Sequence, residues 1–286
     1  MRLHDRILRS VVYIGNANPG GFVPHGTGFL ALVFMGDGGL QQIVTAKHVL
    51  EGIPGPAVHV RLNRLDGLAE VIATRLAEWV EHPDPSVDLA VCPVGIPIDQ
   101  FQQANIDLGD MAIEDFSADS DHIGLGDEVY VVGMFTQRLG EARNIPIVRV
   151  GNVASMPLEK IQTRYGYHDA LLIEIRSIDG LSGSPVFVAT SMVGVDGSDK
   201  IKLRPKRHFR FAGVLLGHDE VVNPRDKVEI RQTDVMRPDE PIEVSVFLNT
   251  GIGIVAPSTD VLEAVNQPKL VRLRDEAMEK HKNSRR

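Results

Sequence analysis

Short apolar segments follow one another along most of the chain. Each is about four to eight residues long, rich in Val, Ile or Leu, and flanked by Gly, Pro, Asn or Asp, which is typical of β-strands. Because no segment with a helical period interrupts them before residue 258, the pattern predicts an all-β protein built of barrels or a sandwich. The segments lie at 11–15, 28–34, 42–46, 57–62, 88–94, 128–134, 146–154, 170–175, 184–189, 211–217, 243–249 and 251–257.

Helical signals are confined to the C-terminal end. Ser258, Thr259 or Asp260 can serve as an N-cap, and Pro268 should end or kink the helix that follows. An acidic segment, 106–127, is poor in β-branched residues and separates two strand-rich parts of the chain. We therefore expect two β-rich domains with a boundary near residue 115.

Charge and composition narrow the function classes. The 286 residues carry a net charge of −8, with a pI of about 5.7, which disfavours generic binding to nucleic acid or to anionic membranes. A basic run at 200–210, KIKLRPKRHFR, is the exception. Two interpretations of this run stay open: a solvated loop, or a docking site for an acidic partner.

The single cysteine, Cys92, excludes an intramolecular disulfide. The first twenty residues lack the apolar run of a signal peptide, and no stretch of about 18 apolar residues occurs anywhere. We therefore expect a cytoplasmic protein that does not enter a membrane.

Three polar residues stand at strand ends or in a turn. His48 follows the apolar run of IVTAKHVL, Asp88 opens a strand in HPDPSVDLAVCPV, and Ser182 lies in the turn of DGLSGSPVF. Taken singly, each has an ordinary structural explanation, as a strand-end histidine, a turn-forming aspartate and a serine in a glycine-rich loop.

Together the three residue types match the needs of nucleophilic acyl transfer. A serine hydroxyl attacks well only when a base accepts its proton, and imidazole titrates close to neutral pH. A carboxylate holds the imidazole in the correct tautomer and stabilises its cation. Glycines at 180 and 183 let the backbone approach a ligand and direct its N–H groups towards it.

In this order, and with the motifs TAKHV, DLAV and GLSGSP, the chain resembles the trypsin-like (chymotrypsin-fold) serine peptidases. It is closest in style to bacterial HtrA/Deg-type protease domains without PDZ domains. The resemblance covers residues 8–265 and implies two six-stranded antiparallel β-barrels with a C-terminal helix. The first barrel, 1–115, would carry His48 and Asp88; the second, 116–265, would carry Ser182; a charged tail would cover 266–286. Further matching motifs are GTGFL (26–30), GDEVYVVG (126–133), VGNVA (150–154), FAGVLLG (211–217) and GIGIVAP (251–257).

The resemblance also implies residue roles. His48 would be the general base, Asp88 its orienting carboxylate and Ser182 the nucleophile, with the N–H groups of Gly180 and Ser182 forming the oxyanion hole. The strand at Gly213, Val214 and Leu215 would pair with an extended substrate.

Substrate preference has two open interpretations. Arg176 lies where trypsin-like enzymes place the residue at the floor of the specificity pocket, which would favour acidic side chains. Leu215 and Leu216 could instead line an apolar pocket.

Three positions depart from the family pattern. Leu181 replaces the Asp that captures a new N-terminus in secreted members, so activation by N-terminal trimming is not expected. Ser184 stands where the family usually has Gly, and Lys47 where a small residue is common.

Other candidates for chemistry are weaker. Asp84 lies in a Pro-flanked turn, and Cys92 suits a buried strand position. The remaining histidines show no zinc-ligand spacing. We therefore expect no metal and no other cofactor.

The sequence thus predicts a serine endopeptidase that acts on protein or peptide substrates without a cofactor. The alternative is a catalytically silent trypsin-fold module that binds extended peptides or partner proteins. The insertions at 189–210 and 218–242 are longer than a barrel needs, so we expect them to gate the site or to bind an activating partner protein.

Overall fold

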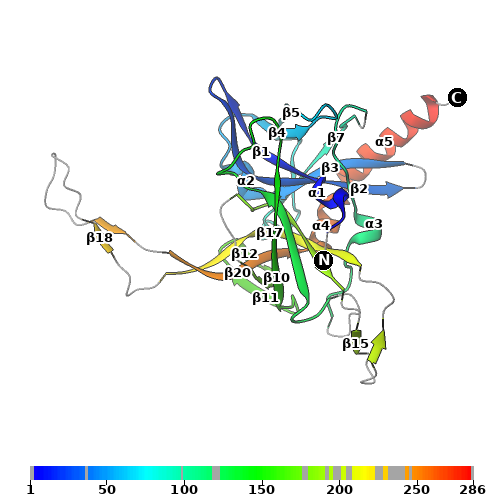
Figure 1. The fold of residues 1–286 in the computed structure, drawn as a ribbon. Coiled ribbons are helices and arrows are strands. Elements are labelled where there is room, and N and C mark those ends of the chain that lie inside the picture. The colour runs from blue at the N-terminus through cyan, green and yellow to red at the C-terminus, as the bar shows by residue number, and fades with distance from the viewer. Residues whose placement is uncertain are drawn as a thin grey trace, which may run out of the picture.

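The computed structural model describes residues 3–35, 38–97, 99–117, 123–175, 180–190, 193–195, 201–203, 208–222, 228–230, 242–244 and 247–284. Figure 1 shows an N-terminal sheet, blue to cyan, beside a C-terminal barrel, green to orange, with the longest helix at the C-terminal end. The predicted all-β fold with a C-terminal helix is confirmed.

The N-terminal sheet contains eight strands in the order β5-β4-β1-β2-β3-β7-β6, with β8 paired to β2. Its two edge strands, β5 and β6, are consecutive in the chain and separated only by a short 3-10 helix, so the chain itself links the two edges. Two of the eight strands have only two residues, which leaves six longer strands. The strands are β1 (Val11–Asn18), β2 (Gly21–Met35), β3 (Gly38–Ala46), β4 (Ala57–Asn63), β5 (Ala69–Arg75), β6 (Val80–Glu81), β7 (Leu89–Val94) and β8 (Ile106–Asp107).

Short helices flank this sheet at its turns. The one that matters for the site is α2, which follows β3 directly. The helices are α1 (Asp5–Leu8), α2 (Lys47–Glu51), the 3-10 helix η1 (Leu76–Glu78) and α3 (Leu108–Met111).

The C-terminal unit is a closed barrel in the order β10-β13-β20-β17-β14-β9, which has the predicted six strands. The pairs in this ring are antiparallel. The barrel strands are β9 (Glu128–Met134), β10 (Pro146–Ser155), β13 (Leu171–Glu174), β14 (Ser184–Ala189), β17 (Phe209–Val222) and β20 (Phe247–Pro257).

Three hairpins extend from the barrel. The β15–β16 and β18–β19 hairpins lie in the two insertions that the sequence singled out. The β11–β12 hairpin, like strand β5, falls outside the segments that the hydrophobic pattern predicted. The hairpins are β11 (Lys160–Thr163) with β12 (Gly166–Asp169), β15 (Val193–Val195) with β16 (Ile201–Leu203), and β18 (Val228–Ile230) with β19 (Ile242–Val244).

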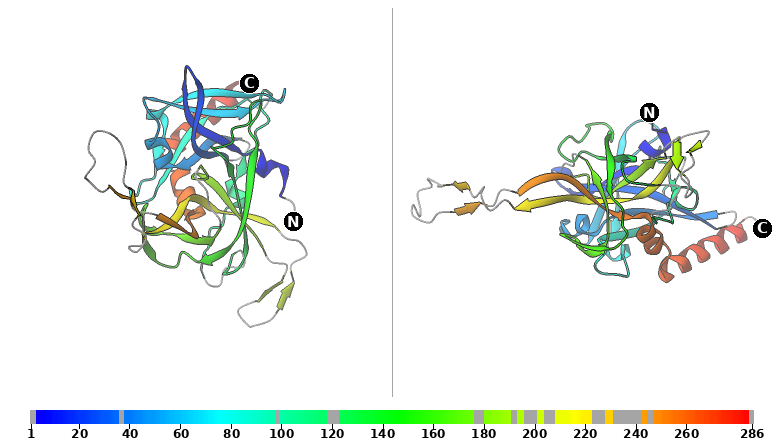
Figure 2. Two further views of the ribbon diagram at one scale, coloured as in Figure 1. Left: turned by 60° about the vertical axis from the view of Figure 1, so that its left-hand side comes forward. Right: turned by 90° about the horizontal axis from the view of Figure 1, so that it is seen from below.

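The far ends of β17 and β20 continue as a two-stranded ribbon, in which Glu220 pairs with Asn249 and Val222 with Phe247. The ribbon projects from the body of the molecule in every view (Figures 1 and 2).

The two β units share an aromatic core. Phe29 of β2 packs on Phe211 of β17 with ring centroids 5.5 Å apart, and Phe187 of β14 lies 5.9 Å from Phe211. All three side chains are fully buried, and burying one such ring contributes about 1.5–3 kcal/mol. This contact fixes the two walls between which the candidate site lies. The domain division near residue 115 stays a prediction.

The C-terminal helices are α4 (Ser258–Val265) and α5 (Pro268–Ser284), so Pro268 separates two helices as predicted. The predicted N-cap is wrong: Pro257 holds that position, and the Ser258 hydroxyl donates to the carbonyl of Ile113 at 2.6 Å.

The segment 266–286 is more than a charged tail. Leu270 of α5 is fully buried, and the nearly buried Arg274 donates to the carbonyl of Val265 at 3.2 Å. Among the residues that the structure describes, no helix combines the length and apolar character needed to cross a membrane.

Candidate active site

His48 and Asp88 meet because of the strand register. In the antiparallel β3–β7 pair, Ala46 lies opposite Leu89, so the residues just beyond β3 face the residue just before β7. The Asp88 carboxylate accepts a hydrogen bond from the His48 backbone N–H at 2.9 Å and lies 2.5 Å from Nδ1 of its ring. Accepting from Nδ1–H leaves Nε2 of the imidazole free to accept a proton. The Asp88 side chain is only 5% exposed, whereas the His48 side chain is one-third exposed.

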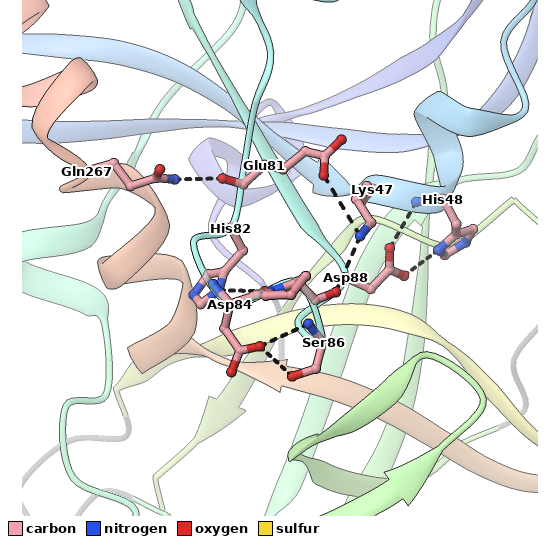
Figure 3. A network of polar contacts seen from close by, with 9 residues as sticks. Lys47, His48, Glu81, His82, Asp84, Ser86, Asp88 and Gln267 are labelled. Carbon is pink, nitrogen blue, oxygen red and sulfur yellow. Dashed lines mark hydrogen bonds and ion pairs between the residues drawn. The ribbon is translucent and has the colours of Figure 1, made fainter.

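The loop before Asp88 is held by its own polar network (Figure 3). Asp84 accepts from the backbone N–H and the hydroxyl of Ser86, at 2.9 and 2.7 Å, and these bonds lower the pKa of the Asp84 carboxyl. Lys47 donates to the carbonyl of Pro85 at 3.5 Å. Asp84 thus behaves as the turn former that the sequence suggested, and the network fixes the approach of Asp88.

The turn that carries Ser182 depends on its glycines. Gly180 and Gly183 have φ values of +91° and +85°, which side-chain-bearing residues rarely adopt. A Cβ at Gly183 would overlap the carbonyl oxygen of Thr27 and the hydroxyl of Thr45. Gly183 is therefore required by the contact between the two β units, whereas a Cβ at Gly180 would overlap Thr136 within the second unit.

Backbone hydrogen bonds hold this turn from both sides. The N–H of Thr27 donates to the Ser182 carbonyl at 2.9 Å, and the Thr27 hydroxyl donates to the carbonyl of Gly180 at 2.9 Å. From the barrel, the N–H of Gly183 donates to the carbonyl of Leu215 at 2.8 Å. Thr27 therefore links the first β unit to the turn of the second.

Ser182 lies beside the helix that carries His48. A Cβ at Gly26 would be 2.8 Å from the Val49 methyls and 3.2 Å from the Ser182 carbonyl oxygen, so Ser182 and the neighbour of His48 meet at Gly26. Among the described residues, no hydrogen bond joins the Ser182 hydroxyl to the His48 ring. The structure thus brings together His48 and Asp88 and places the Ser182 turn near the helix that carries His48, while their catalytic roles stay predictions.

The predicted oxyanion-hole donors have no acceptor within the described part of the chain: none of these residues accepts from the N–H of Gly180 or Ser182. Leu181, between them, is fully buried in the barrel core, so its side chain anchors the turn by packing. The role of these two N–H groups as an oxyanion hole stays a prediction.

The predicted substrate-pairing strand is wrong. Gly213, Val214 and Leu215 are hydrogen-bonded to β14 on one side and to β20 on the other, so they have no free edge for a peptide. The reason is that β14 begins at Ser184, opposite Leu215. Among the described strands, the pairing of β17 with β14 ends at Leu215, so Leu216 and Gly217 have no described strand partner on that side. Arg176 lies outside the described residues.

One aromatic residue near His48 was not indicated by the sequence. The Tyr165 ring, in the turn of the β11–β12 hairpin, stacks on the His48 ring with centroids 5.1 Å apart and planes at 27°. A Cβ at Gly217 would overlap the Tyr165 hydroxyl. The only signal in the sequence was the turn-forming Gly166 within QTRYGYHD, between two short runs of weak strand character.

Other positions behave as buried structure. Cys92 is fully buried in β7, and desolvation raises the pKa of its thiol to about 12, so the thiol is not a nucleophile at neutral pH. Ser184 is also fully buried, with its hydroxyl against Gly133. In the basic run, Arg210 donates to the carbonyls of Asp110 and Ala112 at 2.9 and 2.8 Å, which gives this residue a structural role.

Comparisons with known proteins bear on the fold and the family of the chain. The protease domain of MamO from Magnetospirillum magneticum, in its apo form, has a similar fold, with a TM-score of 0.51 and 14% identity over 91% of this chain and 97% of that chain. The inactive form of the Rv3671c protease, from M. tuberculosis, gives a TM-score of 0.45 and 16% identity over 91% of this chain and 88% of that chain. No curated protein sequence matches the chain. The family model of the trypsin-like peptidase domain matches residues 26–195, more than half of the 286 residues, and the chain belongs to this family.

Proposed function

We propose that the protein is a serine endopeptidase in which Ser182 is the nucleophile, His48 the general base and Asp88 its orienting carboxylate. The observation that carries this proposal is the buried Asp88 carboxylate, which binds both the backbone N–H and Nδ1 of His48. A buried carboxylate that fixes one imidazole tautomer beside a glycine-flanked serine has an evident use in acyl transfer.

In the proposed reaction, Oγ of Ser182 attacks the scissile carbonyl carbon and Nε2 of His48 takes the hydroxyl proton. The N–H groups of Gly180 and Ser182 would donate to the oxyanion, which forms where the carbonyl oxygen was. His48 then returns the proton to the leaving amine, and water, activated by the same imidazole, hydrolyses the acyl-enzyme.

A second candidate function is a silent module that binds extended peptides. Two observations favour it: no hydrogen bond joins the Ser182 hydroxyl to His48, and Tyr165 stacks on the ring that would act as base. Catalytic hydrogen bonds are often long in enzymes without bound substrate, so this geometry is compatible with both functions.

Labelling with a fluorophosphonate probe separates the two. We expect the wild type to react and Ser182→Ala to be inert, with peptide hydrolysis lost by about 10⁶-fold, the loss typical of the nucleophile in serine peptidases. Ser86→Ala, which removes a hydroxyl from the loop beside the site, is the matched control and should label like the wild type. Labelling of Ser182→Ala at the wild-type rate would contradict the assignment of the nucleophile.

A further inference from the structure

The β11–β12 hairpin belongs to the second β unit in sequence but reaches across to the first. Within the described residues it pairs only with itself, as a two-stranded sheet. Lys160 at its base lies 3.7 Å from the carboxylate of Asp84. At its tip, Gly166 adopts a φ of +137°, and a Cβ there would overlap the carbonyl of Ser86. The tip therefore rests on the loop that leads to Asp88.

The turn of the hairpin fixes the direction of Tyr165. The hydroxyl of Thr163 accepts from the Tyr165 N–H and donates to the Gly166 carbonyl, both at 3.1 Å. The guanidinium of Arg164 lies 5.1 Å from the centre of the Tyr165 ring. With the turn held in this way, the half-buried phenol lies over the His48 ring.

The same phenol also reaches the open edge of β17. On this edge, Gly217 still pairs with β20, but no described strand pairs with it on the side of β14, because β14 begins at Ser184. Only a glycine leaves room there for the Tyr165 hydroxyl. Tyr165 therefore fills the space between His48 and the strand edge to which an extended peptide can add.

We infer that Tyr165 determines specificity, by closing the position next to His48 to any substrate residue with a bulky side chain. This inference rests on the proposed function, because it deepens the description of the same site. The residue concerned is P2, the one immediately before the scissile residue P1. The peptidase selects substrates with glycine at P2.

The alternation of side chains along an extended peptide supports this assignment. With its scissile carbonyl at Ser182, such a peptide turns the P1 side chain to one face and the P2 side chain to the other. In this assignment the P2 side chain lies on the face of His48 and the phenol, and the P1 side chain lies on the opposite face. Glycine at P2 removes the overlap, whereas Leu or Phe requires the hairpin to move.

The test uses peptidyl coumarin amides that are randomised at P1 and P3 and carry either Gly or Leu at P2. The coumarin group fixes the register, and kcat/KM is measured for each mixture. We expect the wild type to prefer Gly by about tenfold or more, the scale at which a pocket rejects a misfitting side chain. Tyr165→Ala should lose this preference, chiefly through faster cleavage of the Leu mixture. Tyr165→Phe should keep it.

Tyr167→Ala is the matched control, since Tyr167 stands two residues away on the same hairpin, and its side chain is 57% exposed. It should retain the wild-type preference. Equal rates on the two mixtures in the wild type, or a Gly preference that persists in Tyr165→Ala, would overturn the inference.

Binding separates failure of this inference from failure of the proposed function. If the wild type neither labels nor hydrolyses, the peptidase proposal fails. The inference is then tested by measuring the affinity of Ser182→Ala and of Ser182→Ala/Tyr165→Ala for product-like peptides with Gly or Leu as the penultimate residue. A Gly preference that disappears with Tyr165 supports the inference. If each variant binds the Gly and Leu peptides with equal affinity, the inference is refuted.

Discussion

The turn that carries Ser182 and the hairpin that carries Tyr165 reach the same site by different means. The turn is held by backbone hydrogen bonds from both β units, through Thr27 and Leu215. The hairpin pairs only with itself among the described strands and touches the first unit through its Gly166 tip, the Tyr165 ring on His48 and an exposed ion pair. Segments with few buried contacts open at lower free energy than a barrel core. Ser182, the proposed nucleophile, therefore lies on the more rigid turn. Tyr165, which we propose limits access, lies on the hairpin that moves more easily.

The region around the base of the hairpin also contains a carboxyl group, Asp260, with a strongly shifted pKa. Near the base of the hairpin, burial and the charges of Asp169, Glu263 and Asp84 raise the pKa of Asp260 to about 7, although Lys160 opposes them. One of its carboxylate oxygens is buried without a hydrogen-bond partner in the described part of the chain. Ionisation of Asp260 therefore costs free energy in the folded protein, so the stability of the region near the base of the hairpin should depend on pH.

The largest expected effect tests the rigid part. In Asp88→Asn the Oδ1 atom can still accept from the His48 backbone, but the side chain can no longer stabilise an imidazolium. We expect kcat to fall by about 10⁴-fold, the loss typical of this change in serine peptidases. Asp84→Asn, in the same loop, is the control and should stay within about threefold of the wild type, because the Asp84 carboxylate caps a turn and forms only an exposed ion pair with Lys160 among the described residues. Activity of Asp88→Asn within tenfold of the wild type would contradict the assigned role.

The substitution Gly183→Ala tests whether the turn that carries Ser182 is as tightly packed as its contacts indicate. Positive φ and overlap with Thr27 should together lower the free energy of unfolding by about 2–6 kcal/mol and abolish activity. Gly55→Ala is the matched control, because Gly55 has a φ of +86° and open space around it, so backbone strain alone should cost about 1 kcal/mol. Urea unfolding measures both. Equal losses in the two variants would show that the overlap is unimportant.

The titration of Asp260 tests the electrostatic half of the comparison. Between about pH 4 and pH 7 the folded protein keeps a proton that the unfolded chain has released, so its free energy of unfolding falls as the pH rises through this window. Asp260→Asn should remove this fall, on the order of 2 kcal/mol after allowance for partial exposure. Urea unfolding at pH 5 and pH 8 measures it. Identical pH dependence in Asp260→Asn and the wild type would contradict it.

The smallest expected effect sharpens the comparison on the hairpin itself. Gly166→Ala should lift the tip from Ser86 without unfolding either β unit, so the free energy of unfolding should fall by only about 1 kcal/mol. Because Tyr165 moves with the tip, cleavage of peptides with Leu at P2 should rise relative to those with Gly. A loss as large as that of Gly183→Ala would show that the hairpin is part of the rigid core.

Local signals in the sequence determined much of this protein. Short apolar runs rich in Val, Ile and Leu predicted most strands, Pro268 separated two helices, and the GLSGSP turn could be recognised because its glycines adopt backbone angles that other residues rarely adopt. The pairing of His48 with Asp88 was also predicted, on the resemblance of the TAKHV and DLAV motifs to those of trypsin-like peptidases.

Two features of the site were decided only by the tertiary structure, because they depend on where the strands begin and end relative to one another. Residues 213–215 look like an exposed binding strand in sequence, but they are paired on both sides because β14 starts opposite Leu215. The place of Tyr165 was likewise hidden, because its short hairpin carries weak strand propensity and acquires its position from Ser86, His48 and Gly217, all remote in the chain. A sequence determines local conformation through each residue's own sterics, whereas register and contacts between distant segments arise only when the whole chain packs.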